Sequence, residues 1–434
     1  MLRDLPTRVG IDGFNLALPR GTGIASYART LTHCLKAMGC GVDVVYGMNI
    51  SHQTPIALRE VFFFDGLDQE AVARRPPKPL TLRWWRDRRA DIVGHAAVDV
   101  PITGRVDARG FAHRLPAFDR ILNVPRLYHA AARHFRYTGH FLTITIPDPP
   151  DIMHWTYPLP IRLKGARNIY TVHDLVPLSL PQTTLDDKNY YFRLMHKLTQ
   201  EADALCTVSE ASRTEILSFF PDVSERLHNT YQSFQPIVST DGSRDDDTAW
   251  EIEGLFDLRL GEFFLFFGSL EPKKNIGRLI EAFLMARTDC PLVIVGAMAW
   301  KSEAELRFLE RGVATGRIRQ LEYLPASMLM ALIRGARAVV FPSLCEGFGL
   351  PVLEALSFGT PVLTSREGAL PEVAGEAALF VDAYDTSSIA AGIEELDRND
   401  ALRAKLRSLG PQQAARFNMK RYEERLSKMY EAVL

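Results

Sequence analysis

The sequence contains few cysteines, and they form no close pair. Five are present among 434 residues, and no two have the CxxC spacing. Zinc sites and disulfide frameworks need clustered or regularly spaced cysteines, so neither is expected. Sparse cysteines of this kind are typical of a reducing compartment. The five are Cys34, Cys40, Cys206, Cys290 and Cys345.

An excess of charge of either sign is also missing. The 51 basic and 52 acidic residues give a formal net charge of −1, which argues against a nucleic-acid partner. No stretch approaches the roughly 18 apolar residues that a membrane-spanning helix needs, and the first residues lack the apolar core of a signal peptide. We therefore expect a cytoplasmic protein that is soluble, or at most peripheral on the cytoplasmic face of a membrane.

The sequence does contain a repeated alternation of short apolar runs and amphipathic segments. The segments predict helices at 24–38, 190–202, 276–286, 304–314 and 351–357. Alternation of this kind is typical of parallel βαβ units and predicts an α/β fold. The apolar runs predict strands at 8–11, 42–46, 151–155, 168–173, 204–208, 263–267, 291–295, 338–341 and 361–364.

The chain is too long for one ordinary core, so two domains are expected. Residues 239–262 are polar and acidic at their start, which suits a linker. We predict a Rossmann-like domain over 1–240, a linker over 241–262 and a second Rossmann-like domain over 263–414, with a helix over 415–434 packing back on the first domain. Two doubly wound parallel sheets then face each other across a cleft, and ligands bind at the carboxyl ends of the strands.

The strongest motif is FPSLCEGFGLPVLEALSFGTPVLTS at 341–365. A strand leads to a glycine-rich loop holding Glu346, Pro351 suits the first turn of a helix, and Gly359 suits its end. The free N–H groups of that helix suit a diphosphate. A diphosphate would repel the carboxylates of Glu346, in the loop, and Glu354, in the first turn of the helix. They suit this site only if they bind hydroxyl groups, such as those of sugars. The alternative is an ordinary strand–turn–helix unit with two solvated glutamates.

The second motif is GSLEPKKNIGRLIEAF at 268–283. Lys273 and Lys274 lie between a predicted strand and a predicted helix. Ammonium groups at the carboxyl end of a strand suit a leaving diphosphate. A solvated basic loop is the alternative.

Two weaker features lie in the first half. GTG at residues 21–23 opens a predicted helix, but Ser26 holds the third glycine position of a dinucleotide-binding GxGxxG motif. A plain turn is the alternative. His173 ends a buried strand, where a lone histidine is more often structural. Asp174 either orients His173 or caps a helix, and the sequence does not decide between them.

The Glu346…Glu354 pair within EGFGLPVLEA resembles the E-x7-E signature of the retaining glycosyltransferases of family 4, which have the GT-B fold of two facing Rossmann-like domains. The likeness extends through ALSFGTPV and GALPEVAGEAALFVDAYD and covers most of 263–385. It implies that Glu346 hydrogen-bonds the donor sugar and Glu354 the ribose. It also implies that the intervening loop binds the donor diphosphate or sugar. That loop comprises Gly347, Phe348, Gly349 and Leu350.

Other residues take their expected roles from the same resemblance. Lys274 holds the place of the family's phosphate-binding lysine, Lys273 precedes it, and Ser269 stands where many members carry an arginine. His173 holds the place of a histidine that touches a far hydroxyl of the donor sugar. The implied catalytic residues are therefore His173, Lys274 and Glu346. The N-terminal glycine loop near the diphosphate and the acceptor is represented by Gly21, Thr22 and Gly23.

The resemblance implies transfer of a hexose from a nucleoside diphosphate sugar to a saccharide or lipid-linked saccharide, with retention of configuration and with neither metal nor cofactor. GSLEPKKN and VHDLVPLSLP look most like bacterial mannosyltransferases of polysaccharide and lipopolysaccharide synthesis. That likeness favours GDP-mannose over UDP-, dTDP- and ADP-sugars, with the backbone near 323–325 as the candidate that reads the base. The rivals are a sugar-nucleotide epimerase, a dehydrogenase that Ser26 disfavours, and a catalytically silent sugar-nucleotide-binding protein.

Residues 74–89, RRPPKPLTLRWWRDRR, combine seven basic residues with one acid and two adjacent tryptophans. Cations mixed with tryptophan suit an anionic membrane surface. One interpretation is therefore a peripheral contact with the inner membrane through Arg83, Trp84, Trp85 and Arg86. The other is a solvated face with buried tryptophans, and both stay open.

Overall fold

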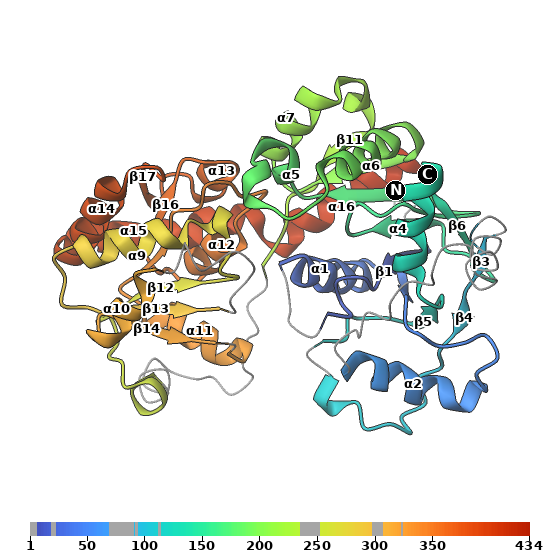
Figure 1. The fold of residues 1–434 in the computed structure, drawn as a ribbon, viewed down its shortest axis with the longest axis horizontal. Coiled ribbons are helices and arrows are strands. Elements are labelled where there is room, and N and C mark those ends of the chain that lie inside the picture. The colour runs from blue at the N-terminus through green and yellow to red at the C-terminus, as the bar shows by residue number, and fades with distance from the viewer. Residues whose placement is uncertain are drawn as a thin grey trace.

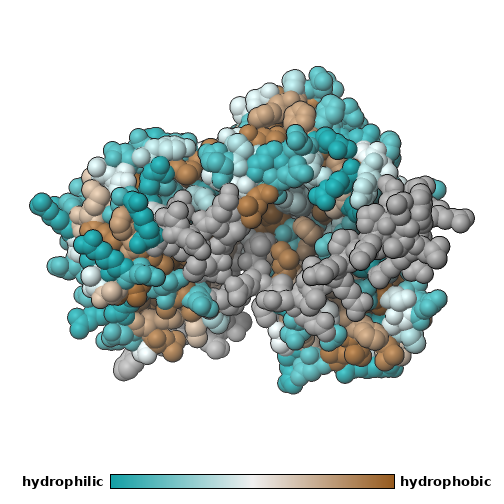
Figure 2. Space-filling view, viewed as in Figure 1, coloured by the Kyte–Doolittle hydropathy of each residue, from teal (hydrophilic) through white to brown (hydrophobic). Residues whose placement is uncertain are grey.

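The computed structural model describes residues 7–18, 23–68, 91, 94–111, 114–234, 252–296, 307–322 and 324–434. These residues form two α/β halves, each built around a sheet of parallel strands. Figure 1 shows the blue-to-green first half on the right and the yellow-to-red second half on the left. The surface is hollowed between them (Figure 2).

The first half contains an eight-stranded sheet that is parallel except at one edge strand. The central strands are buried and apolar, as expected when helices cover both faces. The strand order reverses beside the first strand, and ligands of such folds bind at that point. In order the strands are β11 (Leu227–Asn229), β10 (Ala204–Thr207), β9 (Arg167–Val172), β7 (Ile152–Trp155), β1 (Arg8–Asp12), β2 (Gly41–Tyr46), β5 (Arg120–Asn123) and the antiparallel β4 (Val98–Asp99).

A smaller parallel sheet, which the sequence does not predict, also belongs to the first half. It consists of β3 (His95–Ala96), β6 (Leu142–Thr145) and β8 (Ile161–Leu163). Its strands are two to four residues long. Polar residues interrupt them, so they lack the continuous apolar runs that mark the strands of the two large sheets.

The second half contains a six-stranded, fully parallel sheet. Its strand order reverses between β12 (Phe264–Phe267) and β15 (Ala338–Phe341), which again marks a ligand-binding edge. These two sheets confirm the predicted α/β class with two doubly wound halves. In order the strands are β14 (Ile318–Leu321), β13 (Leu292–Val295), β12 (Phe264–Phe267), β15 (Ala338–Phe341), β16 (Val362–Ser365) and β17 (Ala378–Val381).

The helices predicted at 24–38, 190–202, 276–286 and 351–357 are found close to those positions. Gly359, with φ 69°, follows the end of the last of these helices, as predicted. Part of the helix predicted over 304–314 lies outside the described residues. The helices are α1 (Gly23–Ala37), α2 (Ile56–Asp68), α4 (Leu127–Thr138), α5 (Val176–Ser179), α6 (Lys188–Glu201), α7 (Glu210–Phe219), α9 (Ile276–Met285), α10 (Leu309–Ala314), α11 (Ala326–Gly335), α12 (Leu350–Ser357), α13 (Leu370–Ala374), α14 (Thr386–Arg398), α15 (Asp400–Ala414) and α16 (Met419–Val433).

The C-terminal helix α16 leaves the second half and packs against α1 of the first (Figure 1). A buried polar chain holds it there. Tyr430 Oη lies 2.8 Å from His154 Nδ1, and His154 Nε2 lies 2.8 Å from Thr171 Oγ1. Thr171 Oγ1 in turn lies 3.0 Å from Tyr27 Oη on α1. The last helix is therefore part of the core of the first half.

Residues 252–262, which the sequence assigns to the linker, pack against α11. Ile252 is fully buried, and a Cβ at Gly335 would lie 2.4 Å from its Cδ1. The Gly261 N–H donates to the Gly335 carbonyl at 2.8 Å. This segment is therefore packed as part of the second half.

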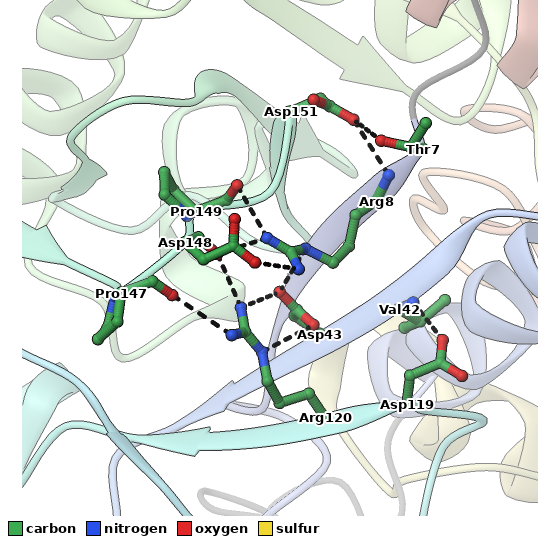
Figure 3. Close-up of polar contacts among 10 residues, drawn as sticks. All are labelled: Thr7, Arg8, Val42, Asp43, Asp119, Arg120, Pro147, Asp148, Pro149 and Asp151. Atoms are coloured by element: carbon green, nitrogen blue, oxygen red, sulfur yellow. Dashed lines mark hydrogen bonds and ion pairs between the residues drawn. The ribbon is translucent and has the colours of Figure 1, made fainter.

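A charged network lies at the amino end of the first sheet, opposite the ligand-binding edge. Figure 3 shows Asp43 between two arginines. Asp43 Oδ2 lies 3.3 Å from Arg8 Nε and 2.7 Å from Arg120 Nη2, and its side chain is 1% exposed. Arg8 also pairs with Asp148 at 2.7 Å. The network joins β1, β2 and β5 to the loop before β7, which indicates a structural role.

Candidate active site

Two of the predicted site residues, Lys274 and Glu346, form a direct ion pair. The Lys274 ammonium lies 2.6 Å from Glu346 Oε1, and the side chains are only 12% and 8% exposed. They meet because Lys274 ends the short turn η4 (Pro272–Lys274) after β12, and Glu346 lies in the loop after the neighbouring strand β15. The ammonium also lies 4.9 Å from the centroid of the Phe341 ring. This pair is the centre of the candidate site.

Asn275 fixes the backbone next to Lys274. It is buried and has φ 60°, in the left-handed region that asparagine takes more readily than most residues. Its side-chain amide donates to the carbonyls of Pro342, at 3.0 Å, and Ala383, at 2.7 Å. It thereby ties the lysine loop to the carboxyl ends of β15 and β17. Asn275 is not among the residues predicted for the site, although a polar residue at a loop–helix boundary is a usable signal.

The glycine loop after Glu346 is shaped by close contacts. A Cβ at Gly347 would lie 2.3 Å from the His173 carbonyl oxygen, so the two halves approach too closely here for a side chain. Gly349 has φ 101° and directly precedes α12. Pro351 has no N–H, and the Val352 and Leu353 N–H groups donate to the Gly349 carbonyl at 3.0 and 3.2 Å, so among the described residues only the Leu350 N–H of this turn has no hydrogen-bond partner. The Phe348 ring is buried against Phe417, with centroids 5.5 Å apart. Phe348 therefore offers a ligand its backbone and not its ring.

Glu354 stands apart from the Lys274–Glu346 pair. α12 begins one residue earlier than expected, at Leu350, so Glu354 is its fifth residue and lies beyond the first turn, which corrects the sequence-based placement. Within the described part of the chain, no group hydrogen-bonds its half-buried carboxyl. Burial raises the pKa of Glu354 to about 8, because a low dielectric disfavours the charged form. Its contact with the donor ribose stays a prediction.

His173 faces the site from the first half. The Thr156 carbonyl lies 2.9 Å from His173 Nε2 and accepts its proton, which leaves Nδ1 as an acceptor in the neutral ring. Burial lowers the pKa of His173 despite this bond and the nearby Asp174 charge, so the ring is neutral at pH 7. The Asp174 carboxylate accepts from the Val176 N–H at 3.3 Å, at the start of α5. Leu175 is the N-cap of α5, and among the described residues no side chain caps that helix, so the capping role of Asp174 is not borne out and the orienting role stays a prediction.

Lys273 connects the two halves of the site. Its ammonium lies 3.7 Å from Asp174 Oδ2. Burial lowers the pKa of Lys273, but the charges of Asp174, Glu346 and Glu271 outweigh burial and raise it, so the ammonium stays charged. Ser269 is exposed, and its hydroxyl donates to Glu271 at 2.6 Å. Two ammonium groups therefore lie among three carboxylates, which restrain them without a ligand.

The remaining predicted site residues are less informative. Gly23 is the first residue of α1, and a Cβ there would meet open space. Gly21, Thr22, Tyr323 and the segment with Arg83, Trp84, Trp85 and Arg86 lie outside the described residues. Within the described residues, no cluster of three histidine, cysteine or carboxylate side chains is placed to hold a metal ion. The described helices also include none with the length and apolar character required to cross a bilayer.

Known proteins resemble the chain both in sequence and in fold. The solved structures include sucrose-phosphate synthase from Thermosynechococcus elongatus, with a TM-score of 0.63 at 17% identity over 98% of each chain. They also include Alr3699/HepE from Anabaena in complex with UDP and glucose, with a TM-score of 0.64 at 12% identity over 97% of this chain and 98% of that one. At these identities the likeness concerns the fold alone. It confirms the expected GT-B fold.

The sequence relatives are glycosyltransferases. O-antigen chain mannosyltransferase B from Escherichia coli is 34% identical over 266 residues, which cover 60% of this chain and 68% of that protein. Serotype-specific mannosyltransferase WbdA from Escherichia coli is 28% identical over 292 residues, which cover 65% of this chain but only 34% of that protein. Residues 260–413 match the family model described as glycosyl transferases group 1. The chain therefore belongs to the glycosyl transferases group 1 family.

Proposed function

We propose that this glycosyltransferase moves a hexose from a nucleoside diphosphate sugar to a hydroxyl group of a saccharide or lipid-linked saccharide, with retention of anomeric configuration. The observation that carries the proposal is the buried Lys274–Glu346 pair, 2.6 Å apart, in the loops that precede α9 and α12. An ammonium group binds phosphate oxygens, and a carboxylate accepts from sugar hydroxyls. The pair thus offers one group for each part of the donor.

The chemistry follows from where charge develops. As the glycosidic bond breaks, negative charge builds on the departing diphosphate, and Lys274, Lys273 and the Leu350 N–H at the start of α12 would stabilise it without a metal. The neutral His173 ring would accept from a hydroxyl of the donor sugar through Nδ1, since Nε2 is held by Thr156. Attack from the same face, with the diphosphate taking the proton of the acceptor hydroxyl, gives retention.

GDP-mannose is the preferred donor, and a bacterial polysaccharide such as an O-antigen chain is the preferred acceptor. Both preferences rest on the sequence relatives, which are mannosyltransferases, one of them of the O-antigen chain. A panel of GDP, UDP, dTDP and ADP in thermal-shift measurements identifies the base, because a ligand that binds only the folded protein raises Tm. A rise with UDP alone would refute the GDP assignment.

The transfer itself is tested with variants of the central pair. Lys274→Ala and Glu346→Ala should each lower kcat/KM by about 10²–10³-fold, the loss seen when one transition-state donor is removed. Lys405→Ala is the matched control, since Lys405 is exposed on α15. Parent-like turnover in both site variants would remove the proposed donor site. Incubation with donor alone separates an epimerase, which would yield an isomeric sugar nucleotide, from a silent binding protein, which would yield no product.

The proposal extends to a peripheral membrane contact. α2 carries apolar side chains at the surface, with Ile56 63%, Val61 46% and Phe62 48% exposed. In the sequence, the basic, tryptophan-containing segment 74–89 begins a few residues after the end of α2. Apolar and basic residues in succession suit an anionic bilayer surface. Co-sedimentation with vesicles containing phosphatidylglycerol should fall when Val61 and Phe62 are both changed to Ser. Equal binding of parent and variant would argue against α2.

A further inference from the structure

The first turn of α7, in the first half, is held by a carboxylate of the second half. Glu372, on α13, accepts from the backbone N–H of Glu210 at 3.0 and 3.1 Å and from that of Ala211 at 3.2 Å. These N–H groups form the helix N-terminus, where a negative charge is stabilised. The Tyr231 hydroxyl donates to the same carboxylate at 2.6 Å. One side chain of the second half thus joins two separate segments of the first.

Tyr231 itself is held in a strained conformation. It has φ 59°, in the left-handed region that bulky residues rarely adopt. Its backbone N–H donates to Asn229 at 2.8 Å, and its ring lies between Arg425 (4.5 Å) and Phe417 (5.3 Å). Strain of this kind persists where surrounding contacts over-determine the conformation. The strained residue lies just after β11, where the chain leaves the last strand of the first half.

The same turn of α7 contacts both loops of the site. Ser212 Oγ lies 2.8 Å from the His173 carbonyl oxygen and 3.1 Å from that of Gly347. A hydroxyl has one proton, so it donates to one of the two oxygens at a time and stays within reach of both. On the other side, the Ala369 N–H donates to the Glu346 carbonyl at 3.0 Å. The segment that leads into α13 is therefore tied to the Glu346 loop.

We propose that Glu372 is a positioning residue that latches the two halves together and holds the His173 loop against the Glu346 loop during sugar transfer. Glu372 contacts no reacting group and acts through α7. That the positioned loops serve sugar transfer rests on the proposed function, whereas the contact between the two halves does not depend on it. Loss of the latch separates the loops and admits water, so hydrolysis of the donor gains over transfer.

The test replaces Glu372 by glutamine, which keeps the shape of the side chain and removes its charge. Glu376→Gln is the matched control, because Glu376 is exposed in the same segment. Small-angle X-ray scattering measures the radius of gyration of the free protein, calorimetry measures Kd for GDP, and product analysis measures transfer and hydrolysis. In Glu372→Gln we expect a larger radius of gyration, a transfer kcat lowered about tenfold or more, and a higher ratio of hydrolysis to transfer. Kd for GDP should stay within about twofold of the parent, because the proposed nucleotide contacts lie in the second half.

Other outcomes have a defined meaning. A parent-like radius of gyration and transfer rate in Glu372→Gln would overturn the latch. An equal loss of GDP affinity and transfer would also overturn it, because that pattern indicates damage to the donor site itself. A larger radius of gyration, in a protein whose parent transfers no sugar, supports the latch and refutes the proposed function. If Glu372→Gln does not fold, Tyr231→Phe removes one of the latch hydrogen bonds and should give smaller changes in the same direction.

Discussion

Glu354→Gln is expected to stabilise the free protein at neutral pH and to weaken its binding of the donor. Burial raises the pKa of Glu354 from 4.5 to about 8, so the folded state favours the protonated carboxyl. Below pH 4.5 the carboxyl is protonated in both states. As pH rises from 4.5 toward 8, Glu354 ionises in the unfolded chain but stays protonated in the folded chain, so the free energy of unfolding falls across this window. At about 1.4 kcal/mol per pH unit, the burial of Glu354 lowers the free energy of unfolding at pH 7 by about 3 kcal/mol.

Urea unfolding at pH 5, 7 and 8.5 measures this effect. The free energy of unfolding of Glu354→Gln should exceed that of the parent by up to about 3 kcal/mol at pH 7 and by less than about 1 kcal/mol at pH 5. The exposed Glu376→Gln serves as the control. The KM for the donor should rise in Glu354→Gln, because an amide cannot ionise to the carboxylate that we propose accepts from the donor ribose. If parent and variant lose stability in parallel between pH 5 and 8.5, the reasoning about an unpartnered carboxyl is wrong.

Three further predictions concern stability, each measured by urea unfolding. Asn275→Ala should lower the free energy of unfolding by about 3 kcal/mol, because two buried carbonyls lose their donor and alanine is strained at φ 60°. Asn275→Gly should recover about 1 kcal/mol of this loss, because glycine adopts that φ without strain. Asp43→Ala should cost about 3 kcal/mol by leaving Arg8 and Arg120 without their shared carboxylate, with kcat unchanged. Burial lowers the pKa of His154 to about 3, so as pH falls the ring gains a proton more readily in the unfolded chain than in the folded one. The free energy of unfolding of the parent should therefore fall by about 2.5 kcal/mol between pH 6.5 and 4.5. His154→Gln should remove this loss.

Much of the fold and the centre of the site follow from local patterns. The strands around the site are continuous apolar runs of four or more residues, so their positions are visible in the sequence. Lys274 and Glu346 each follow such a strand, and the carboxyl ends of neighbouring parallel strands share one edge of a sheet. Their direct contact is therefore a consequence of strand order, although the 2.6 Å pairing distance is a matter of side-chain packing.

The parts that the sequence does not reveal depend on contacts between distant segments. Glu372 meets Glu210, which lies 162 residues earlier, and no local period encodes how two separate cores dock. The conformation of Tyr231 is fixed by groups from three other elements, so its left-handed backbone has no local signature. Glu354 lies one residue further into its helix than predicted, because Gly349 is the N-cap and the helix begins at Leu350, one residue before Pro351. Such boundaries depend on cap geometry.

The two edges of the protein handle buried polar groups in opposite ways. At the amino edge of the first sheet, Asp43 is closed off by two arginines, which leaves little for a ligand to offer. At the candidate site, the Glu354 carboxyl has a raised pKa and no hydrogen-bond partner among the described residues, which lowers the stability of the free protein at neutral pH. Sequences that specify one fold satisfy their polar groups except where function requires otherwise. In the proposed function a donor ribose would bring hydroxyl groups to Glu354, so the cost of this buried carboxyl is the expected mark of a binding site.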